Sequence, residues 1–123
     1  MTATHHLGLL LLRVSFAGAM LVHGIPKLLN LLSGNFEFGN PIGVGPEVSL
    51  ILTVIGEAIC PMLIIIGFKT RLMTIPTIIT MLVAAFIVHA SDDFYTKEKA
   101  LLYLFGFVAI ALLGGGKFGV SRK

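Results

Sequence analysis

The stretch GLLLLRVSFAGAMLVHGIPKLL, residues 8–29, decides the fold class because it is long and apolar enough to cross a lipid bilayer. Three ionisable side chains interrupt it, those of Arg13, His23 and Lys27. On an α-helix these three lie within a sector of roughly 80°. A charge near the centre of a bilayer costs about 3 kcal/mol or more, so this shared face is expected to look into a bundle of helices.

The composition excludes most classes of soluble protein. Of 123 residues, 56% are hydrophobic and only 12% are charged, and the mean hydropathy is +0.98. A soluble domain of this size needs a polar surface that this composition cannot supply. The net charge is only +3 and the basic residues form no run, which argues against nucleic-acid binding. A single domain over residues 1–123 is expected.

Four segments are apolar over roughly the 20 residues needed to span a bilayer, at residues 7–25, 48–67, 72–90 and 98–114. Residues 72–88 and 100–113 lack the polar stripe that a soluble helix carries. Since lipid tolerates no unpaired backbone groups, the sequence predicts an all-α fold, a four-transmembrane-helix bundle that runs up-down-up-down. The fourth segment is short and reaches spanning length only by including Glu98 and Lys99.

Basic residues predict the orientation in the membrane. One side of the predicted bundle carries more of them, Lys69, Arg71, Lys117, Arg122 and Lys123. The other side carries fewer, Lys27, Lys97 and Lys99. The side richer in Lys and Arg is expected to be cytoplasmic, which places both termini inside and the loops 26–47 and 90–97 outside.

Glu57 is the only carboxylate deep in any of the four segments. Arg13 lies at a similar predicted depth, so the sequence predicts a buried Arg13–Glu57 ion pair. Pro61 lacks the N–H that would bond the carbonyl of Glu57. Pro26 leaves the carbonyl of Val22 free in the same way. Freed carbonyls beside ionisable groups suggest a polar pocket inside the bundle, although a packed kink would produce the same pattern.

A second polar cluster is expected toward the outer face. It gathers helix ends and the loop that follows the third segment, at His23, Lys27, His89, Asp92, Asp93, Tyr95 and Glu98. Two histidines among carboxylates could relay protons or hydrogen-bond a carbonyl head group. No HxxxH or HxxE spacing supports a metal site, so no metal is expected. The alternative is that these are solvated end groups and that the buried ion pair only fixes helix packing.

Four stretches follow one another along the chain, LLRVSFAGAMLVHGIPKLL, GEAICPMLIIIGFKTR, VHASDDF and EKALLYLFGFVAIALLGGGKFGV. Together they resemble the DoxX family of small bacterial membrane proteins. The recurring positions of that family fall here on Arg13, His23, Gly24, Lys27, Glu57, Gly67, Thr70, Arg71, His89, Glu98 and Tyr103. Residues 30–47 are the least typical part. The resemblance implies a multi-pass protein of the bacterial cytoplasmic (inner) membrane.

The resemblance also implies a function, because DoxD-like relatives are associated with thiosulfate:quinone oxidoreduction and some DoxX members with membrane-bound oxidoreductase assemblies. The leading hypothesis is therefore a membrane component of a redox system with a quinone-sized pocket. The pocket candidates are Arg13, His23, Lys27, Glu57, His89, Glu98 and Tyr103. The chain carries no motif for an intrinsic cofactor, so electron transfer would require a quinone or a partner redox subunit.

Two other functions stay open. One is a small proton-coupled transporter or channel subunit that uses Glu57, and the other is a purely structural scaffold subunit. Besides the lipid bilayer, the partners considered are other membrane subunits and a second copy of the chain. Whether the chain catalyses a reaction by itself is left open.

Overall fold

The computed structural model describes residues 2–36, 38–39, 41–88 and 91–120. Every regular element in these residues is helical, which confirms the all-α prediction. The elements are α1 (Ala3–Leu32), α2 (Pro46–Val54), η1 (Ile55–Ile59), α3 (Cys60–Ile66), α4 (Thr70–Val83), η2 (Ala84–Val88) and α5 (Phe94–Leu113). The elements η1 and η2 are π-helical turns. Because α2, η1 and α3 are continuous, as are α4 and η2, the described residues form four helical rods.

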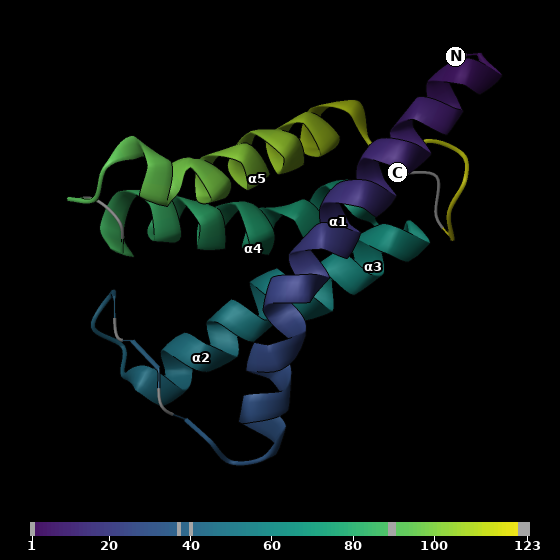
Figure 1. Ribbon diagram of the computed structural model, residues 1–123. Helices are drawn as coiled ribbons and strands as arrows, with labels where there is room; N and C mark the ends of the chain where they lie inside the picture. Colours follow the sequence, from purple (N-terminus) through teal and green to yellow (C-terminus); the bar gives the residue numbers. More distant parts are fainter. Residues whose placement is uncertain (1, 37, 40, 89–90, 121–123) are drawn as a thin grey trace.

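The rods run alternately up and down. In Figure 1, α4 and α5 lie side by side, and α1 crosses beside the rod formed by α2, η1 and α3. The two ends of the described chain lie at the same end of the molecule, near the start of α1. This arrangement brings the end of α1, the start of α2 and the start of α5 to the opposite end.

Three helices are long and apolar enough to cross a membrane, Ala3–Leu32, Pro46–Ile66 and Thr70–Val88. The fourth rod, α5, has 20 residues, but its first turns carry Lys97, Glu98 and Lys99. The described residues therefore hold three candidate spans where the sequence predicts four, and the crossing by α5 stays a prediction. The helix α1 also continues past Pro26, beyond the predicted end at residue 25, since apolar helices in membranes tolerate a proline.

The turn between α3 and α4 is tight because Gly67 adopts a left-handed conformation, with φ at +77°. Its N–H donates to the carbonyl of Ile64 (3.0 Å), and the N–H of Phe68 donates to that of Leu63 (2.9 Å). These two hydrogen bonds form a Schellman motif, in which glycine avoids the strain that a side chain would meet at positive φ. The motif ends α3 and turns the chain back toward α4.

Small residues let α1 and α4 approach η1 closely. A side-chain carbon placed on Gly24 of α1 would lie only 2.0 Å from the carbonyl oxygen of Glu57. On another side of the turn, the hydroxyl of Thr77 on α4 donates to the carbonyl of Gly56 (2.6 Å). Pro61 has no N–H to offer these carbonyls, so neighbouring helices contact them instead.

Two apolar clusters fill the space between the rods. The larger lies between α1, α3, α4 and α5 and consists of Ala17, Met20, Ile64, Met81, Leu104, Phe107 and Ile110. The smaller lies on α2 and η1, against α1, and consists of Leu50, Val54 and Ala58. Met20 and Met81 of the larger cluster also line the cavity that forms the candidate site. The apolar core therefore continues directly into that cavity.

The substitution Gly24→Ala is expected to destabilise the fold, because the added carbon would clash with the backbone of η1. Overpacking of this kind costs about 1–3 kcal/mol, against a gain of about 1 kcal/mol in helix propensity. Gly18→Ala on the same helix is the matched control, since nothing lies within 4 Å of a carbon placed there. Thermal unfolding in detergent, followed by circular dichroism, should show a lower Tm only for Gly24→Ala. An equal Tm for both variants would contradict the close approach.

Candidate functional site

The Lys27–Glu57 ion pair is the centre of the candidate site. The Nζ atom of Lys27 lies 2.8 Å from Oε1 and 2.9 Å from Oε2 of Glu57. The Glu57 side chain is 7% exposed and that of Lys27 is 33% exposed. Glu57 belongs to the π-helical turn η1, and such turns are frequent at functional sites. The predicted Arg13–Glu57 ion pair is therefore wrong, because the carboxylate is paired with Lys27.

The contact at Gly24 explains this correction. The helix α1 meets η1 at Gly24, and Lys27 follows three residues later on the next turn. Arg13 lies eleven residues before Gly24, a separation of about 16 Å along the helix axis. The predicted first span, residues 7–25, puts Arg13 near its middle, at a depth similar to that of Glu57. The observed helix α1 extends to Leu32, and it contacts Glu57 through its C-terminal half, away from Arg13.

Arg13 is buried, with only 2% of its surface exposed, and it binds backbone carbonyls. Its guanidinium donates to the carbonyls of Gly115 (Nη1, 2.7 Å), Ile65 (Nη2, 3.2 Å) and Phe118 (Nη2). Ile65 lies in the last turn of α3, where the negative end of the helix dipole favours a cation. Gly115 and Phe118 lie in the tail after α5. Arg13 therefore joins this tail to the end of α3 and does not line the candidate site.

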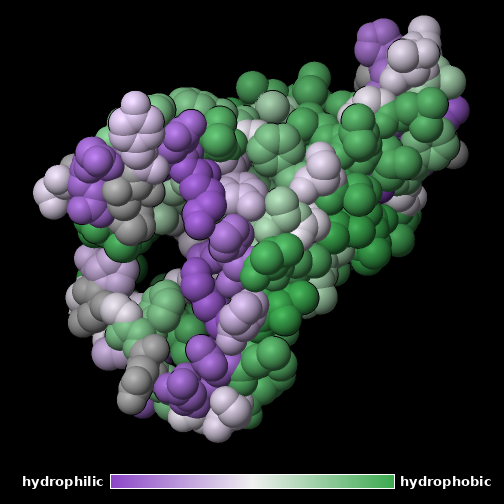
Figure 2. Space-filling model, viewed as in Figure 1, coloured by the Kyte–Doolittle hydropathy of each residue, from purple (hydrophilic) through white to green (hydrophobic). Residues whose placement is uncertain are grey.

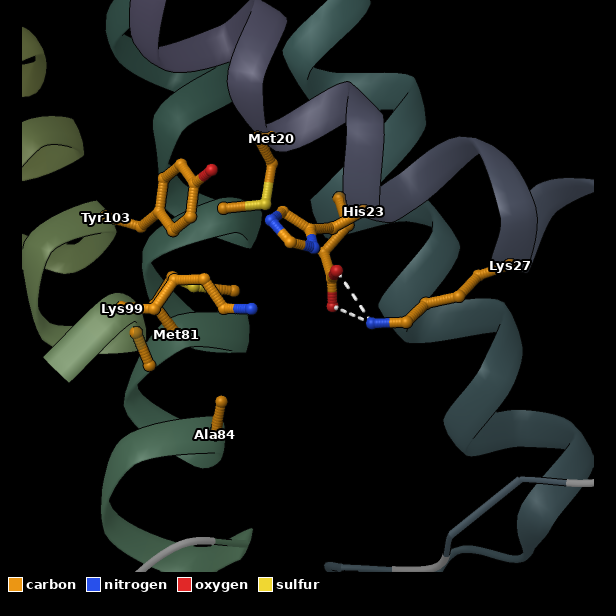
Figure 3. Close-up of a pocket in the computed structure, with 9 residues that line it drawn as sticks. Met20, His23, Lys27, Met81, Ala84, Lys99 and Tyr103 are labelled. Carbon is orange, nitrogen blue, oxygen red and sulfur yellow. Dashed lines mark hydrogen bonds and ion pairs between the residues drawn. The ribbon is translucent and has the colours of Figure 1, made fainter. Parts of the chain in front are cut away.

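A cavity of about 210 Å³, which we call the central cavity, opens beside the ion pair. It lies where α1, η1, the α4–η2 rod and α5 meet. Its lining consists of Met20, His23, Lys27, Glu57, Met81, Ala84, Lys99, Ala100 and Tyr103. In Figure 3, Lys99 extends from α5 into the space toward the side of α1, and dashed lines mark the bonds between Lys27 and Glu57. The central cavity thus combines one paired carboxylate, two ammonium groups and apolar walls.

Aromatic contacts position the polar groups on the α1 and α5 sides of the central cavity. The rings of His23 and Tyr103 meet edge to face, with 5.8 Å between their centroids. Tyr103 stacks on Phe107 and meets Phe16 edge to face. Within the described residues, no hydrogen bond involves the imidazole of His23, the hydroxyl of Tyr103 or the ammonium of Lys99. These groups are therefore available to a ligand in the central cavity.

A larger cavity of about 370 Å³, which we call the apolar cavity, adjoins the first. The two share Lys27, Glu57 and Ala84. The rest of the apolar cavity is formed by the segment before α2, by α2 and by the α4–η2 rod, at Phe38, Gly39, Pro41, Ile42, Ser49, Leu52, Thr53, Ile79, Thr80, Val83 and Val88. The ion pair therefore lies between the central cavity, which carries several further polar side chains, and the apolar cavity.

The site lies toward the hydrophilic end of the molecule. Figure 2 shows hydrophilic side chains gathered at the end where α1 ends and α5 begins, around a hollow, whereas most of the remaining face is hydrophobic. Lys27 and Lys99 come from these same ends of α1 and α5. The central cavity therefore lies near the hydrophilic end of the molecule, beside the hydrophobic remainder of this face.

Four of the predicted pocket residues come together in the central cavity: His23, Lys27, Glu57 and Tyr103. Glu98, like Arg13, lines neither the central nor the apolar cavity. The prediction for His89 lies outside the described residues. Three further residues of the predicted outer cluster, Asp92, Asp93 and Tyr95, are exposed near the start of α5.

Lys99 is the polar residue of the central cavity that was not among the pocket candidates from the sequence. It lies four residues before Tyr103, so both side chains occupy one face of α5. That spacing is the signal that would have found it. In the part of the chain that the structure describes, no three His, Cys, Asp or Glu side chains come together as metal ligands.

Comparison with known proteins gives one match. A model of the DoxX family matches residues 8–90, more than half of the chain. The matched part includes Gly24, Lys27 and Glu57 and ends before α5, so that Lys99 and Tyr103 lie beyond it. No curated protein and no solved structure matches the chain.

The substitution Arg13→Lys is expected to release the tail after α5, because one ammonium cannot bridge three carbonyls as the planar guanidinium does. Each lost hydrogen bond to a charged group is worth about 1.5–3 kcal/mol. Trypsin cleavage after Lys117 should therefore become at least tenfold faster. Glu57→Gln is the control and should leave this cleavage unchanged. Equal acceleration of cleavage in both variants would contradict this prediction, because it would indicate that Arg13 and Glu57 interact.

The substitution Lys27→Met is expected to destabilise the protein, because it leaves the Glu57 carboxylate buried without its partner. The loss should be about 2–3 kcal/mol, below the value for a fully buried pair, because Lys27 is partly exposed. The double variant Lys27→Met/Glu57→Leu should recover most of that loss, since it buries no charge at this position. Thermal unfolding in detergent checks both. A double variant no more stable than Lys27→Met would contradict the importance of the pair.

Proposed function

Because the chain belongs to the DoxX family, we propose that it is an integral membrane component of a redox system and that its central cavity binds a quinone head group. The observation that carries this proposal is the central cavity itself, in which hydrogen-bonding groups line a space between apolar helices. The quinone assignment is a proposal about the ligand. The family and the membrane character of the helices are its premises.

A quinone head group is a flat, mainly apolar ring with two carbonyl oxygens that accept hydrogen bonds. Ligand pockets for such molecules are largely apolar with a few well-placed polar groups. Met20 and Met81 supply apolar walls, while the imidazole of His23 and the hydroxyl of Tyr103 supply donors. Arg13, one of the pocket candidates from the sequence, has no part in this proposal because its guanidinium donates to the carbonyls of Gly115, Ile65 and Phe118.

The apolar tail of a quinone fits the apolar cavity. That cavity adjoins the central one at the Lys27–Glu57 pair, so a ligand with a polar ring and an apolar tail can occupy both. Reduction of a quinone consumes protons as well as electrons. In this proposal the ionisable side chains that line the cavity, His23 and Glu57 among them, would deliver the protons, and the electrons would come from a partner subunit.

We also propose that α5 crosses the membrane as the fourth span, with both termini on the cytoplasmic side of the bacterial inner membrane. Both ends of the described chain lie at one end of the molecule, which favours an even number of crossings. That end carries Lys69, Arg71 and Lys117, in agreement with the positive-inside rule. A reporter fused to the C-terminus that is active only in the cytoplasm should therefore be active.

A second candidate function is a proton-coupled transporter or channel subunit. It is favoured by one specific observation, the position of the Glu57 carboxylate between two cavities. A carboxylate in such a position can bind a proton or a cation on its way across the bundle. In this case Glu57→Gln would abolish a flux in proteoliposomes, and no quinone would bind.

The quinone proposal predicts that the purified protein binds decylubiquinone in detergent, measured by isothermal titration calorimetry. Tyr103→Phe should weaken binding roughly threefold to tenfold, because it removes one hydrogen bond worth about 0.5–1.5 kcal/mol. Tyr95→Phe is the matched control, since it removes the same hydroxyl from the exposed start of the same helix. Absence of binding to the unmodified protein, or an equal loss in both variants, would contradict the proposal.

A further inference from the structure

A third hollow, of about 340 Å³, lies between α1 and α5, and we call it the α1–α5 groove. It is lined by Ser15, Phe16, Ala19, Lys99, Leu102 and Tyr103. The hydroxyl of Ser15 donates to the carbonyl of Leu11 (2.6 Å) and so is already used within α1. Leu102 is 60% exposed, so the groove opens onto the apolar outer surface that faces lipid. Its volume lies within the range of roughly 300–1,000 Å³ found for pockets that hold a small ligand.

The groove adjoins the central cavity, because Lys99 and Tyr103 line both. These two residues are four positions apart on one face of α5. Their ammonium and hydroxyl groups are donors, and within the described residues neither makes a hydrogen bond or an ion pair. The junction therefore offers two free donors at the end of an otherwise apolar groove.

The charges around the junction do not balance. Lys27 and Lys99 are the two ammonium groups that line the central cavity, and Glu57 is its only carboxylate. Both oxygens of Glu57 are held by Lys27. The ammonium of Lys99 is thus left with one uncompensated positive charge. Lys99 is exposed in the first turns of α5, and Coulomb attraction to its ammonium would stabilise an anion beside it.

From this combination we propose that the α1–α5 groove binds a single-chain fatty carboxylate. Its acyl chain lies along Phe16, Ala19 and Leu102, and its carboxylate accepts hydrogen bonds from Lys99 and Tyr103. One negative charge on the ligand compensates the one unpaired ammonium. The occupant has a single chain because the groove offers one apolar path, along Phe16, Ala19 and Leu102, to the two donors. Such a ligand enters sideways from the bilayer, and the proposal does not rest on quinone binding.

The test is binding of oleate to the full-length protein in a neutral detergent, measured by native mass spectrometry. One oleate should bind per chain, and oleyl alcohol, which has the same chain without the charge, should bind at least tenfold more weakly. Lys99→Met should weaken oleate binding at least tenfold, whereas Lys99→Arg should retain it. Lys97→Met is the matched control, because it removes the same charge from the same end of α5 without lining the groove.

A second variant keeps the test valid if Lys99→Met does not fold. Ala19→Phe fills the groove from the exposed side of α1 and leaves both donors in place. It should abolish oleate binding while leaving decylubiquinone binding unchanged, which separates this proposal from the quinone proposal.

Four results would overturn the proposal. If oleyl alcohol bound as tightly as oleate, the charge of the ligand would play no part in binding. If Lys97→Met weakened oleate binding as much as Lys99→Met, only the net charge of the protein would matter and not the position of Lys99. Full displacement of oleate by an equal concentration of phosphatidylglycerol would assign the groove to a two-chain lipid. Equal binding of acetate would show that the acyl chain contributes nothing.

Discussion

The close approach of α1 to the π-helical turn η1 at Gly24 determines the geometry of the site. There the α-carbon of Gly24 faces the carbonyl of Glu57, so near that even a methyl group would not fit. This contact sets the register between the two helices, and the register places Lys27 beside the Glu57 carboxylate. Pro61 contributes to the same contact, because it leaves the carbonyls of the turn without their usual partners. The ion pair, the two cavities that share it and the separation of Arg13 from it all follow from this register.

Arg13, which is buried, and Lys27, which is partly exposed, are satisfied in different ways on α1. Lys27 pairs with a carboxylate at the edge of two cavities, whereas Arg13 donates to carbonyls at the end of α3 and in the tail after α5. A planar guanidinium suits the second task because its donors point in several directions at once. An ammonium suits the first because it approaches both carboxylate oxygens as a compact charge. The same helix therefore carries a structural anchor in its N-terminal half and the candidate site in its C-terminal half.

Helical periodicity predicts from the sequence that His23 and Lys27 share one face of α1, and in the structure both line the central cavity. The predicted partner of Glu57, Arg13, is wrong. The depth of Arg13 in the membrane was estimated from the apolar segment 7–25, whereas α1 continues to Leu32. The hydrogen-bond partners of Arg13 could not be predicted from the sequence, because they are backbone carbonyls, which every residue has. Lys99 was overlooked because charged residues at the start of a helix usually only meet solvent. In the structure Lys99 lines the central cavity together with Tyr103.

Stability alone does not account for an ion pair in this position. Replacing a buried ion pair by well-packed apolar residues is often neutral or stabilising, because two charges must lose their hydration when they are buried. Here the pair does not lie in a packed core, since it borders the central cavity on one side and the apolar cavity on the other. The pair instead keeps the helices joined while leaving room for a molecule that is polar at one end and apolar at the other, which is the chemistry of a membrane-soluble ligand.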